Sequence, residues 1–165
     1  MEQANLVSQS YLTFRLGDEI FAASVAKVLE ILELSKITKV PRSPGFMRGV
    51  INLRGNVLPV IDTRSKFGLE KTPDTVNTCI MVLNLEIGIE QITVGALVDA
   101  VLEVFEIDES RTLPPPTLGS KYKAEFITGM FKSDQDFIML LDMDKVFSTE
   151  ELTIVQEALQ TPINQ

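Results

Sequence analysis

The sequence contains no histidine and no tryptophan, and it has only one cysteine and two tyrosines. The missing histidine removes the commonest general base and the commonest metal ligand. Cys79 alone can form neither an internal disulfide nor a thiolate metal cage, and its apolar neighbours favour a small buried hydrophobe. We therefore expect no metal and no cofactor, and nothing in the residues points to an enzyme.

Long hydrophobic runs and basic runs are also missing. No apolar stretch reaches the roughly 18 residues needed to span a bilayer. Residues 1–5 lack the basic and apolar regions of a signal peptide. The 15 basic and 23 acidic residues give a net charge of −8, which disfavours nucleic acid and anionic lipid. The sequence thus predicts a soluble, cytoplasmic protein with no nucleic-acid partner and no direct membrane insertion.

The common catalytic motifs are absent as well: there is no phosphate-binding loop, nucleophile elbow or dinucleotide-binding glycine pattern. Asp134 with Asp136, and Asp142 with Asp144, superficially suggest metal or acid–base chemistry. A calcium loop would need a third ligand, a glycine and a distal glutamate at fixed spacing, and these are missing. We interpret the first pair as a solvated hairpin turn and Asp142 as the cap of a short helix.

Short apolar segments separated by turn residues make up most of the chain and predict a mainly β fold. Gly55-Asn56 suits a tight hairpin turn with positive φ. Pro59 places its strand at a sheet edge or at a bulge. The predicted strands cover residues 11–16, 20–23, 49–53, 57–61, 79–85, 91–97, 126–131 and 137–141.

Helical patterns are short. The apolar residues of the segment 25–32 recur at i, i+3, i+4 and i+7, which predicts a short helix or helical turn capped by Ser24. Ser148 and Glu151 have the spacing of a capping box that opens a C-terminal helix. Residues 98–105 combine helical and strand features. Short helices are predicted over 62–67 and 142–147, a linker over 70–77, and a proline-rich loop over 112–124.

Two blocks of sequence recur in the same order. Residues 24–32 match residues 97–105, 73 positions later, and residues 49–67 match residues 129–147, 80 positions later. Two such blocks, each in the same place relative to predicted strands, favour an internal duplication over chance similarity. Each half then has about five short strands, which is enough for a small closed barrel. A groove between two packed barrels is a usual place for a binding site.

The sequence resembles the CheW family of chemotaxis coupling proteins over roughly residues 10–155. The most specific part is Met47-Arg48-Gly49-Val50-Ile51-Asn52-Leu53-Arg54-Gly55, followed by Leu58-Pro59-Val60-Ile61-Asp62. Further matching segments are Val28-Leu29-Glu30-Ile31, Val40-Pro41, Val98-Asp99-Ala100-Val101, Phe126-Ile127-Thr128-Gly129 and residues 138–147.

The fold implied by the resemblance is mainly β: two intertwined five-stranded SH3-like β-barrels related by internal duplication, with short helices and a C-terminal helix. Residues 1–165 would form a single CheW-like domain. The first barrel would cover about residues 10–70, the second about 77–147, and the helix 148–160.

The resemblance also implies a function. CheW-like proteins are non-enzymatic scaffolds that couple the cytoplasmic tip of methyl-accepting chemoreceptors to a CheA-type histidine kinase, in arrays at the membrane. The kinase's regulatory domain is itself CheW-like. The residues that the family pattern assigns to receptor binding are Val28 and Glu30 on one groove wall, Gly49 and Arg54 on the hairpin, and Val98 and Val101 on the other wall.

Taken without the resemblance, the same residue types have ordinary structural roles. The three valines would be core, the charges of Glu30 and Arg54 would be surface groups worth little, and Gly49 would be a bulge or turn residue. The kinase-binding residues cannot be chosen by pattern, although exposed apolar strand ends are the expected place.

Three alternatives remain open at this point. One is a CheW-like adaptor of another chemosensory system, such as pilus-based motility. Another is an enzyme built on small barrels, which lacks candidate catalytic groups. The last is nucleic-acid binding, which the charge of −8 and the scarcity of aromatic residues argue against.

Overall fold

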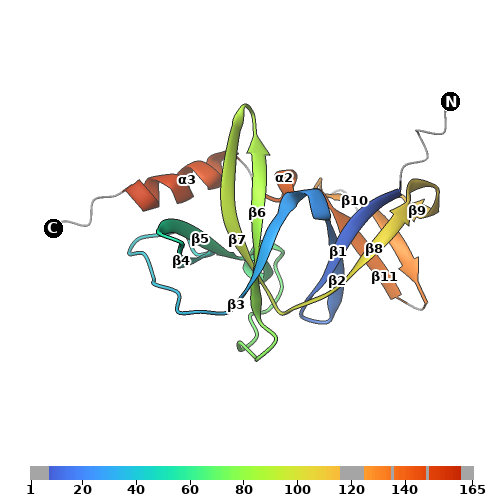
Figure 1. Cartoon of the computed structure of the whole chain (residues 1–165), viewed down its shortest axis with the longest axis horizontal. Coiled ribbons are helices and arrows are strands. Elements are labelled where there is room, and N and C mark those ends of the chain that lie inside the picture. Colours follow the sequence, from blue (N-terminus) through green and yellow to red (C-terminus); the bar gives the residue numbers. More distant parts are fainter. Residues whose placement is uncertain (1–7, 116–124, 135, 148, 161–165) are drawn as a thin grey trace.

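The computed structural model describes residues 8–115, 125–134, 136–147 and 149–160. Within these ranges the chain is mainly β, with few and short helices (Figure 1). The strands are β1 (Ser8–Leu16), β2 (Glu19–Ser24), β3 (Val28–Glu33), β4 (Met47–Leu53), β5 (Asn56–Asp62), β6 (Cys79–Ile87), β7 (Glu90–Val98), β8 (Ala100–Asp108), β9 (Thr112–Leu113), β10 (Ile127–Ser133) and β11 (Asp136–Leu141). The helices are α1 (Thr63–Lys66), α2 (Met143–Val146) and α3 (Thr149–Gln160), with 3₁₀ turns at Val25–Lys27 and Glu109–Arg111. None of the helices in the described ranges has the length and apolarity needed to cross a membrane.

The strands form two curled sheets, which make the two lobes of Figure 1. One sheet has six strands in the order β8-β1-β2-β11-β10-β9, and the other has five in the order β3-β6-β7-β5-β4. The expectation of two small β units is confirmed, with the two-residue strand β9 as an extra member of the first. Helix α3 lies on the side of β4 and β5 (Figure 1), where Lys66 binds Glu151 at 2.6 Å and Leu152 and Val155 are buried.

The two lobes exchange strands. β2, from the first half of the chain, pairs in parallel with β11 from the second half, and β5 pairs in parallel with β7. The lobes are therefore intertwined, as the resemblance implies. Their boundaries do not follow the expected ranges 10–70 and 77–147, because one sheet combines residues 8–24 with residues 100–141 and the other uses residues 28–98.

The strand pairing reproduces the sequence repeat. In the five-stranded sheet Val60 lies opposite Gly95, and in the six-stranded sheet Leu140 lies opposite Ala22. These two pairs are equivalent, because Leu140 follows Val60 by the offset of 80 residues and Gly95 follows Ala22 by the offset of 73. A bulge just before Gly49 in β4 recurs just before Gly129 in β10. The two halves thus adopt the same local structure, and each supplies strands to both lobes.

Three apolar clusters hold the lobes together. A large shared cluster contains residues of both sheets, for example Phe14 and Leu83, together with the α3 residue Leu152. A second cluster around Val60 fills the five-stranded lobe, and a third around Leu140 fills the six-stranded lobe. Each lobe has its own interior, and the shared cluster joins the two into one body.

The prediction of a helix over residues 25–32 is wrong beyond its first turn. Ser24 does accept a hydrogen bond from Ala26 N, as a cap would, but the chain then enters strand β3. Within β3 the half-buried and exposed residues alternate, and pairing with β6 satisfies the backbone. The apolar residues of this segment fit both the helical period and the two-residue period of a strand. Pairing with β6 stabilises the strand. The equivalent segment 98–105 likewise becomes a strand, most of it in β8.

Three smaller expectations also need correction. The positive φ values in the β4–β5 hairpin belong to Arg54 (51°) and Gly55 (87°), so the turn lies one residue earlier than Gly55-Asn56. The strand holding Pro59 is interior, between β4 and β7. Pro59 is tolerated because the parallel pairing with β7 starts at Val60. Residues 112–113, expected in a loop, form β9, and the capping residue Ser148 lies outside the described residues.

Gly49 is required by a close contact inside its own lobe. Its φ is +149°, and a Cβ there would overlap the carbonyl oxygen of Thr38 and lie 2.7 Å from Ile37 Cγ2. Thr38 and Val50 exchange backbone hydrogen bonds of 2.8 and 2.9 Å at this point. Gly49 therefore allows the segment around Thr38 to pair with β4.

The substitution Gly49→Ala is expected to lower the free energy of unfolding by about 2–3 kcal/mol, because the methyl group meets backbone and the φ angle is strained. Gly45→Ala is the matched control, since no atom lies within 4 Å of its Cβ position, and it should change stability by less than about 0.5 kcal/mol. Urea denaturation of both variants measures the difference. Equal stability of the two variants would contradict the assigned role.

Candidate partner-binding site

The exposed end of the β4–β5 hairpin carries an ion pair between two of the expected site residues. Arg54, in the turn, donates through both terminal nitrogens to the carboxylate of Glu30 on β3, with Nη1 at 3.3 Å from Oε1. The turn is fixed by its positive φ values and by a 2.8 Å hydrogen bond from Gly55 N to Asn52 Oδ1. The Arg54 side chain is 66% exposed and the Glu30 side chain 31%. The pair can therefore present a guanidinium face to a partner while Glu30 orients it.

The other expected residues differ in accessibility. Val28 and Val101 occupy equivalent positions at the start of β3 and β8, and both are partly buried against the shared core. Val98 is fully buried in that core and cannot touch a partner directly. Gly49 faces Thr38 of the chain itself. The structure thus brings Glu30 and Arg54 together and leaves Val28 and Val101 accessible at their edges.

Exposed apolar side chains mark two strand edges that the sequence did not single out. Leu29 and Ile31 lie on β3, which is the outer strand of its sheet, with exposed fractions of 56% and 45%. Leu102 and Val104 lie at the equivalent positions of β8, also an outer strand, and are 45% and 57% exposed. The sequence repeat could have identified these edges, because its offset of 73 residues aligns Leu29 with Leu102 and Ile31 with Val104. Paired apolar edges of this kind are typical of protein contact surfaces.

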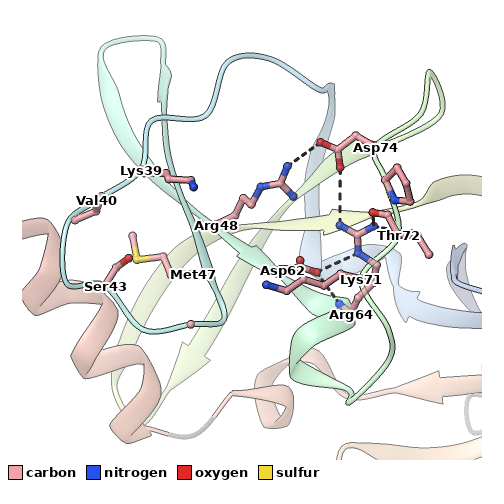
Figure 2. A pocket seen from close by; sticks show the side chains of 12 residues that line it. Lys39, Val40, Ser43, Met47, Arg48, Asp62, Arg64, Lys71, Thr72 and Asp74 are labelled. Atoms are coloured by element: carbon pink, nitrogen blue, oxygen red, sulfur yellow. Dashed lines mark hydrogen bonds and ion pairs between the residues drawn. The ribbon is translucent and has the colours of Figure 1, made fainter.

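An open cleft of about 530 Å³ lies at the other end of β4 (Figure 2). Its walls come from the loop before β4, from the start of β4 and from residues 71–74. Lys39 and Lys71 enter from the two loops, and Arg48 projects from β4 toward Asp74 (Figure 2). None of the six expected site residues lines this cleft.

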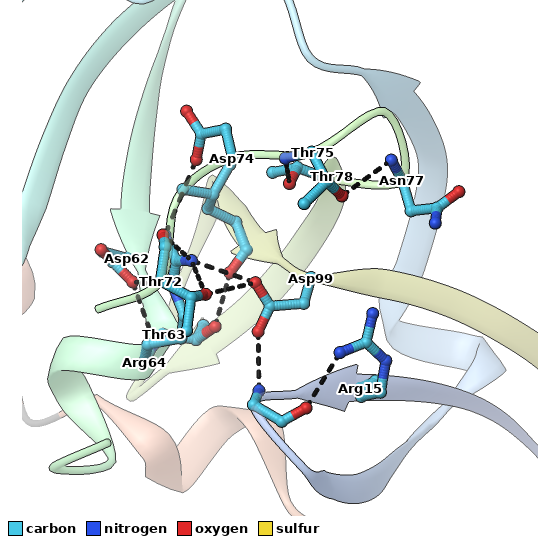
Figure 3. A network of polar contacts seen from close by, with 12 residues as sticks. Arg15, Asp62, Thr63, Arg64, Thr72, Asp74, Thr75, Asn77, Thr78 and Asp99 are labelled. Atoms are coloured by element: carbon cyan, nitrogen blue, oxygen red, sulfur yellow. Dashed lines mark hydrogen bonds and ion pairs between the residues drawn. The ribbon is translucent and has the colours of Figure 1, made fainter. Parts of the chain in front are cut away.

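Arg64, one of the residues that line the cleft, has a buried guanidinium at the centre of a network of polar contacts (Figure 3). Arg64, 1% exposed, follows the Asp62 cap of α1 and donates from Nε to Asp62 Oδ1 at 3.2 Å. Its Nη1 donates to Asp99 Oδ1 at 3.0 Å and to the carbonyl and hydroxyl oxygens of Thr72, both at 2.8 Å. Asp99 Oδ2 in turn accepts from Gly17 N at 2.6 Å. The network ties α1, the segment 70–77 and the β1–β2 turn to the crossover between β7 and β8.

The sequence did not predict this network. Residues 70–77 were expected to be a linker, and they do connect the two blocks of strands, but Thr72 and Asp74 anchor them to Arg64. The signal that was available is an arginine two residues after a capping aspartate, between two apolar strands. An arginine this completely buried needs carboxylate and hydrogen-bond partners to offset the loss of water around its charge.

The second half of the chain carries a related ion pair with the charges exchanged. Asp144, in α2, accepts from Lys27 at 2.8 Å and from Glu86 N at 2.8 Å. The hydrogen bond to Asp144 raises the pKa of the Lys27 ammonium above its usual value. Lys27 lies in the 3₁₀ turn between β2 and β3, and Asp99 lies between β7 and β8, so each lobe fastens a short helix to the crossover after its parallel strand.

Among the described residues, no group of three or more histidine, cysteine or acidic side chains is placed to hold a metal ion. Burial raises the pKa of the Cys79 thiol, partly offset by a backbone hydrogen bond with Val101. Cys79 is only partly buried and packs against the shared core.

Removing the buried guanidinium tests the network. Arg64→Met leaves the Asp62 and Asp99 carboxylates buried without their partner, and we expect a loss of about 3–5 kcal/mol in urea denaturation. Arg48→Met is the matched control, because the Arg48–Asp74 pair is roughly one-third exposed and should be worth about 1 kcal/mol or less. A loss below about 1 kcal/mol for Arg64→Met would contradict the assigned role.

The thiol of Cys79 should react slowly in the folded protein, because burial disfavours the thiolate that attacks thiol reagents. We expect native protein at pH 8 to react with a disulfide reagent about tenfold or more slowly than urea-unfolded protein. Absorbance of the released thiolate follows both rates. Equal rates would show that Cys79 is freely accessible.

Comparison with known proteins agrees with this architecture. The CheW-like domain family model matches residues 10–151. The chain is 32% identical to the chemotaxis protein CheW of Klebsiella aerogenes, over 94% of this chain and 91% of that protein. It is 33% identical to protein FrzA of Myxococcus xanthus, over 86% of each. The crystal structure of the scaffolding protein TtCheW from Thermoanaerobacter tengcongensis superposes with a TM-score of 0.75 at 31% identity, covering 88% of this chain and 96% of that one. The chain therefore belongs to the family of proteins built on the CheW-like domain.

Proposed function

We propose that this protein is a non-enzymatic chemotaxis scaffold that couples methyl-accepting chemoreceptors to a CheA-type histidine kinase. The observation that carries the proposal is the family match over residues 10–151. Relatives at about one-third identity are named chemotaxis proteins, and the solved neighbour is titled a scaffolding protein. The charged and apolar surfaces described above fit a protein that acts by holding partners.

The receptor surface in this proposal is the Glu30–Arg54 pair with the accessible edges of Val28 and Val101. A helical receptor tip is recognised by apolar anchors that supply affinity and by a few charges that fix its orientation. Arg54 is the residue best placed for direct contact, because its side chain is 66% exposed. Val98 supports this surface from the core beneath it, and Gly49 holds β4 in place.

The kinase surface in this proposal is one of the two apolar strand edges, β3 with Leu29 and Ile31 or β8 with Leu102 and Val104. Both belong to outer strands whose free side can accept another protein. A scaffold needs at least two separate surfaces, and the duplicated edges supply them. The protein itself would remain in the cytoplasm and reach membrane-associated arrays through the receptor.

Affinity capture tests the function and Arg54 together. With the purified protein as bait in a lysate of the organism of origin, mass spectrometry should recover a multidomain histidine kinase and a coiled-coil chemoreceptor. With Arg54→Glu as bait, receptor recovery should fall at least tenfold, about 1.4 kcal/mol, while kinase recovery is retained. Lys132→Glu, an exposed charge reversal on β10, is the control and should recover both.

The double variant Glu30→Arg/Arg54→Glu separates two roles of Arg54. It restores an ion pair but exchanges the charge that faces the partner, so receptor recovery should remain low. Full recovery would mean that Arg54 acts only by pairing with Glu30. Recovery of neither kinase nor receptor by the folded wild-type bait would overturn the proposed function, and recovery of a kinase of another chemosensory system would reassign the pathway.

A further inference from the structure

One third of the basic residues of this acidic chain fall in one short segment. Residues 36–54 contain five basic side chains and no acidic one, although the whole chain has a net charge of −8. Three of the five, Lys36, Lys39 and Arg42, precede β4, and Arg48 lies within it. A local charge opposite to that of the whole molecule points to an anionic partner at this place.

The middle of this segment, residues 39–48, forms one wall of the 530 Å³ cleft and brings Lys39 and Arg48 to it (Figure 2). Lys39 enters from this wall, and Lys71 enters from the opposite loop. Arg48 stands between them at the start of β4, and the backbone at Gly45 and the hydroxyl-bearing Ser43 complete the rim. Basic groups therefore meet in the cleft from separate parts of the chain.

The charges within the cleft are not fully balanced. Arg64 is buried and committed to Asp62 and Asp99, and Arg48 is paired with Asp74 at 2.7 Å. Lys39 and Lys71 have no ion-pair partner among the described residues. Two cations thus face the cleft without a counter-charge from the chain.

Apolar side chains accompany these cations. Val40 and Met47 line the cleft itself. A smaller hollow of about 270 Å³ shares Lys39 and Arg48 with it and adds Leu34 and Ile37. Inorganic phosphate would pair with the lysines but leave the apolar side chains in contact with water. A peptide with both acidic and apolar residues would pair with the lysines and also bury the apolar side chains.

We propose that this cleft binds an acidic, partly apolar peptide segment of a protein partner. Carboxylates of the segment pair with Lys39 and Lys71, and an apolar side chain beside them packs against Leu34 and Ile37. The surface lies at the opposite end of β4 from Arg54, and none of the expected receptor-binding residues lines it. The proposal therefore stands independently of the coupling function proposed above.

The ion pair between Arg48 and Asp74 allows a test in which a substitution should raise the affinity for an acidic peptide. Among the described residues that line the cleft, Asp74 carries the only exposed acidic group, since the other lining carboxylate, Asp62, is 3% exposed. Asp74→Asn removes its negative charge and frees Arg48, so an acidic peptide should bind more tightly. A gain in affinity cannot result from a variant that fails to fold.

The experiment uses the full chain and a fluorescein-labelled peptide in which glutamates alternate with leucines, followed by fluorescence anisotropy at low salt. We expect a Kd below about 1 mM, weakening as salt is raised. Lys39→Gln/Lys71→Gln should lose at least about tenfold in affinity, and Asp74→Asn should gain about threefold. Lys132→Gln/Lys145→Gln removes two exposed lysines outside the cleft and should leave binding unchanged.

Several results would overturn the proposal. These are equal binding of a peptide with glutamine in place of glutamate, equal loss in the control double variant, or no binding up to about 1 mM. Competition by inorganic phosphate at equal charge concentration would assign the cleft to a small anion. Binding to phosphatidylserine vesicles that is lost in Lys39→Gln/Lys71→Gln would assign it to a lipid surface.

Discussion

The buried guanidinium of Arg64 is the interaction that fixes how the two lobes meet at the crossover between them. It meets Asp62 of its own helix, Asp99 at the crossover from one sheet to the other, and Thr72 of the connecting segment. A buried ion pair adds little stability compared with apolar residues of the same size, but a buried charge without its partner is costly. The network therefore specifies how the crossover, the helix and the loop fit together, while the shared apolar cluster supplies most of the stabilisation.

Duplication gives this arrangement twice, and divergence makes the two copies chemically different. Arg54 and Asp134 occupy equivalent turn positions, with φ values of 51° and 53°, but they carry opposite charges. Arg64 pairs with an aspartate after β7, whereas its counterpart Asp144 pairs with a lysine after β2. A repeated backbone with altered side chains gives one small protein several unlike surfaces, which is what a scaffold with more than one partner needs.

Charge is distributed unevenly over this repeated frame. The net charge of −8 disfavours large anionic partners for the molecule as a whole, yet the cleft between Lys39 and Lys71 is locally basic. The Glu30–Arg54 pair lies at the far end of the same strand. Strand β4 thus connects two charged surfaces of different character, and the glycine at position 49 keeps it paired with Thr38.

The sequence alone determined the β class, most strands, the internal repeat and the short helices capped by Asp62 and Asp142, because these depend on local periodicity and turn chemistry. The family resemblance named Glu30 and Arg54 as site residues, and the structure showed that they form an ion pair. Only the tertiary structure decided that residues 28–33 form a strand, that β2 pairs with β11 and β7 with β5, and that Val98 is fully buried while Val28 and Val101 are not. It alone revealed Arg64 and the basic cleft, because long-range pairing and burial bring together residues that no local pattern connects.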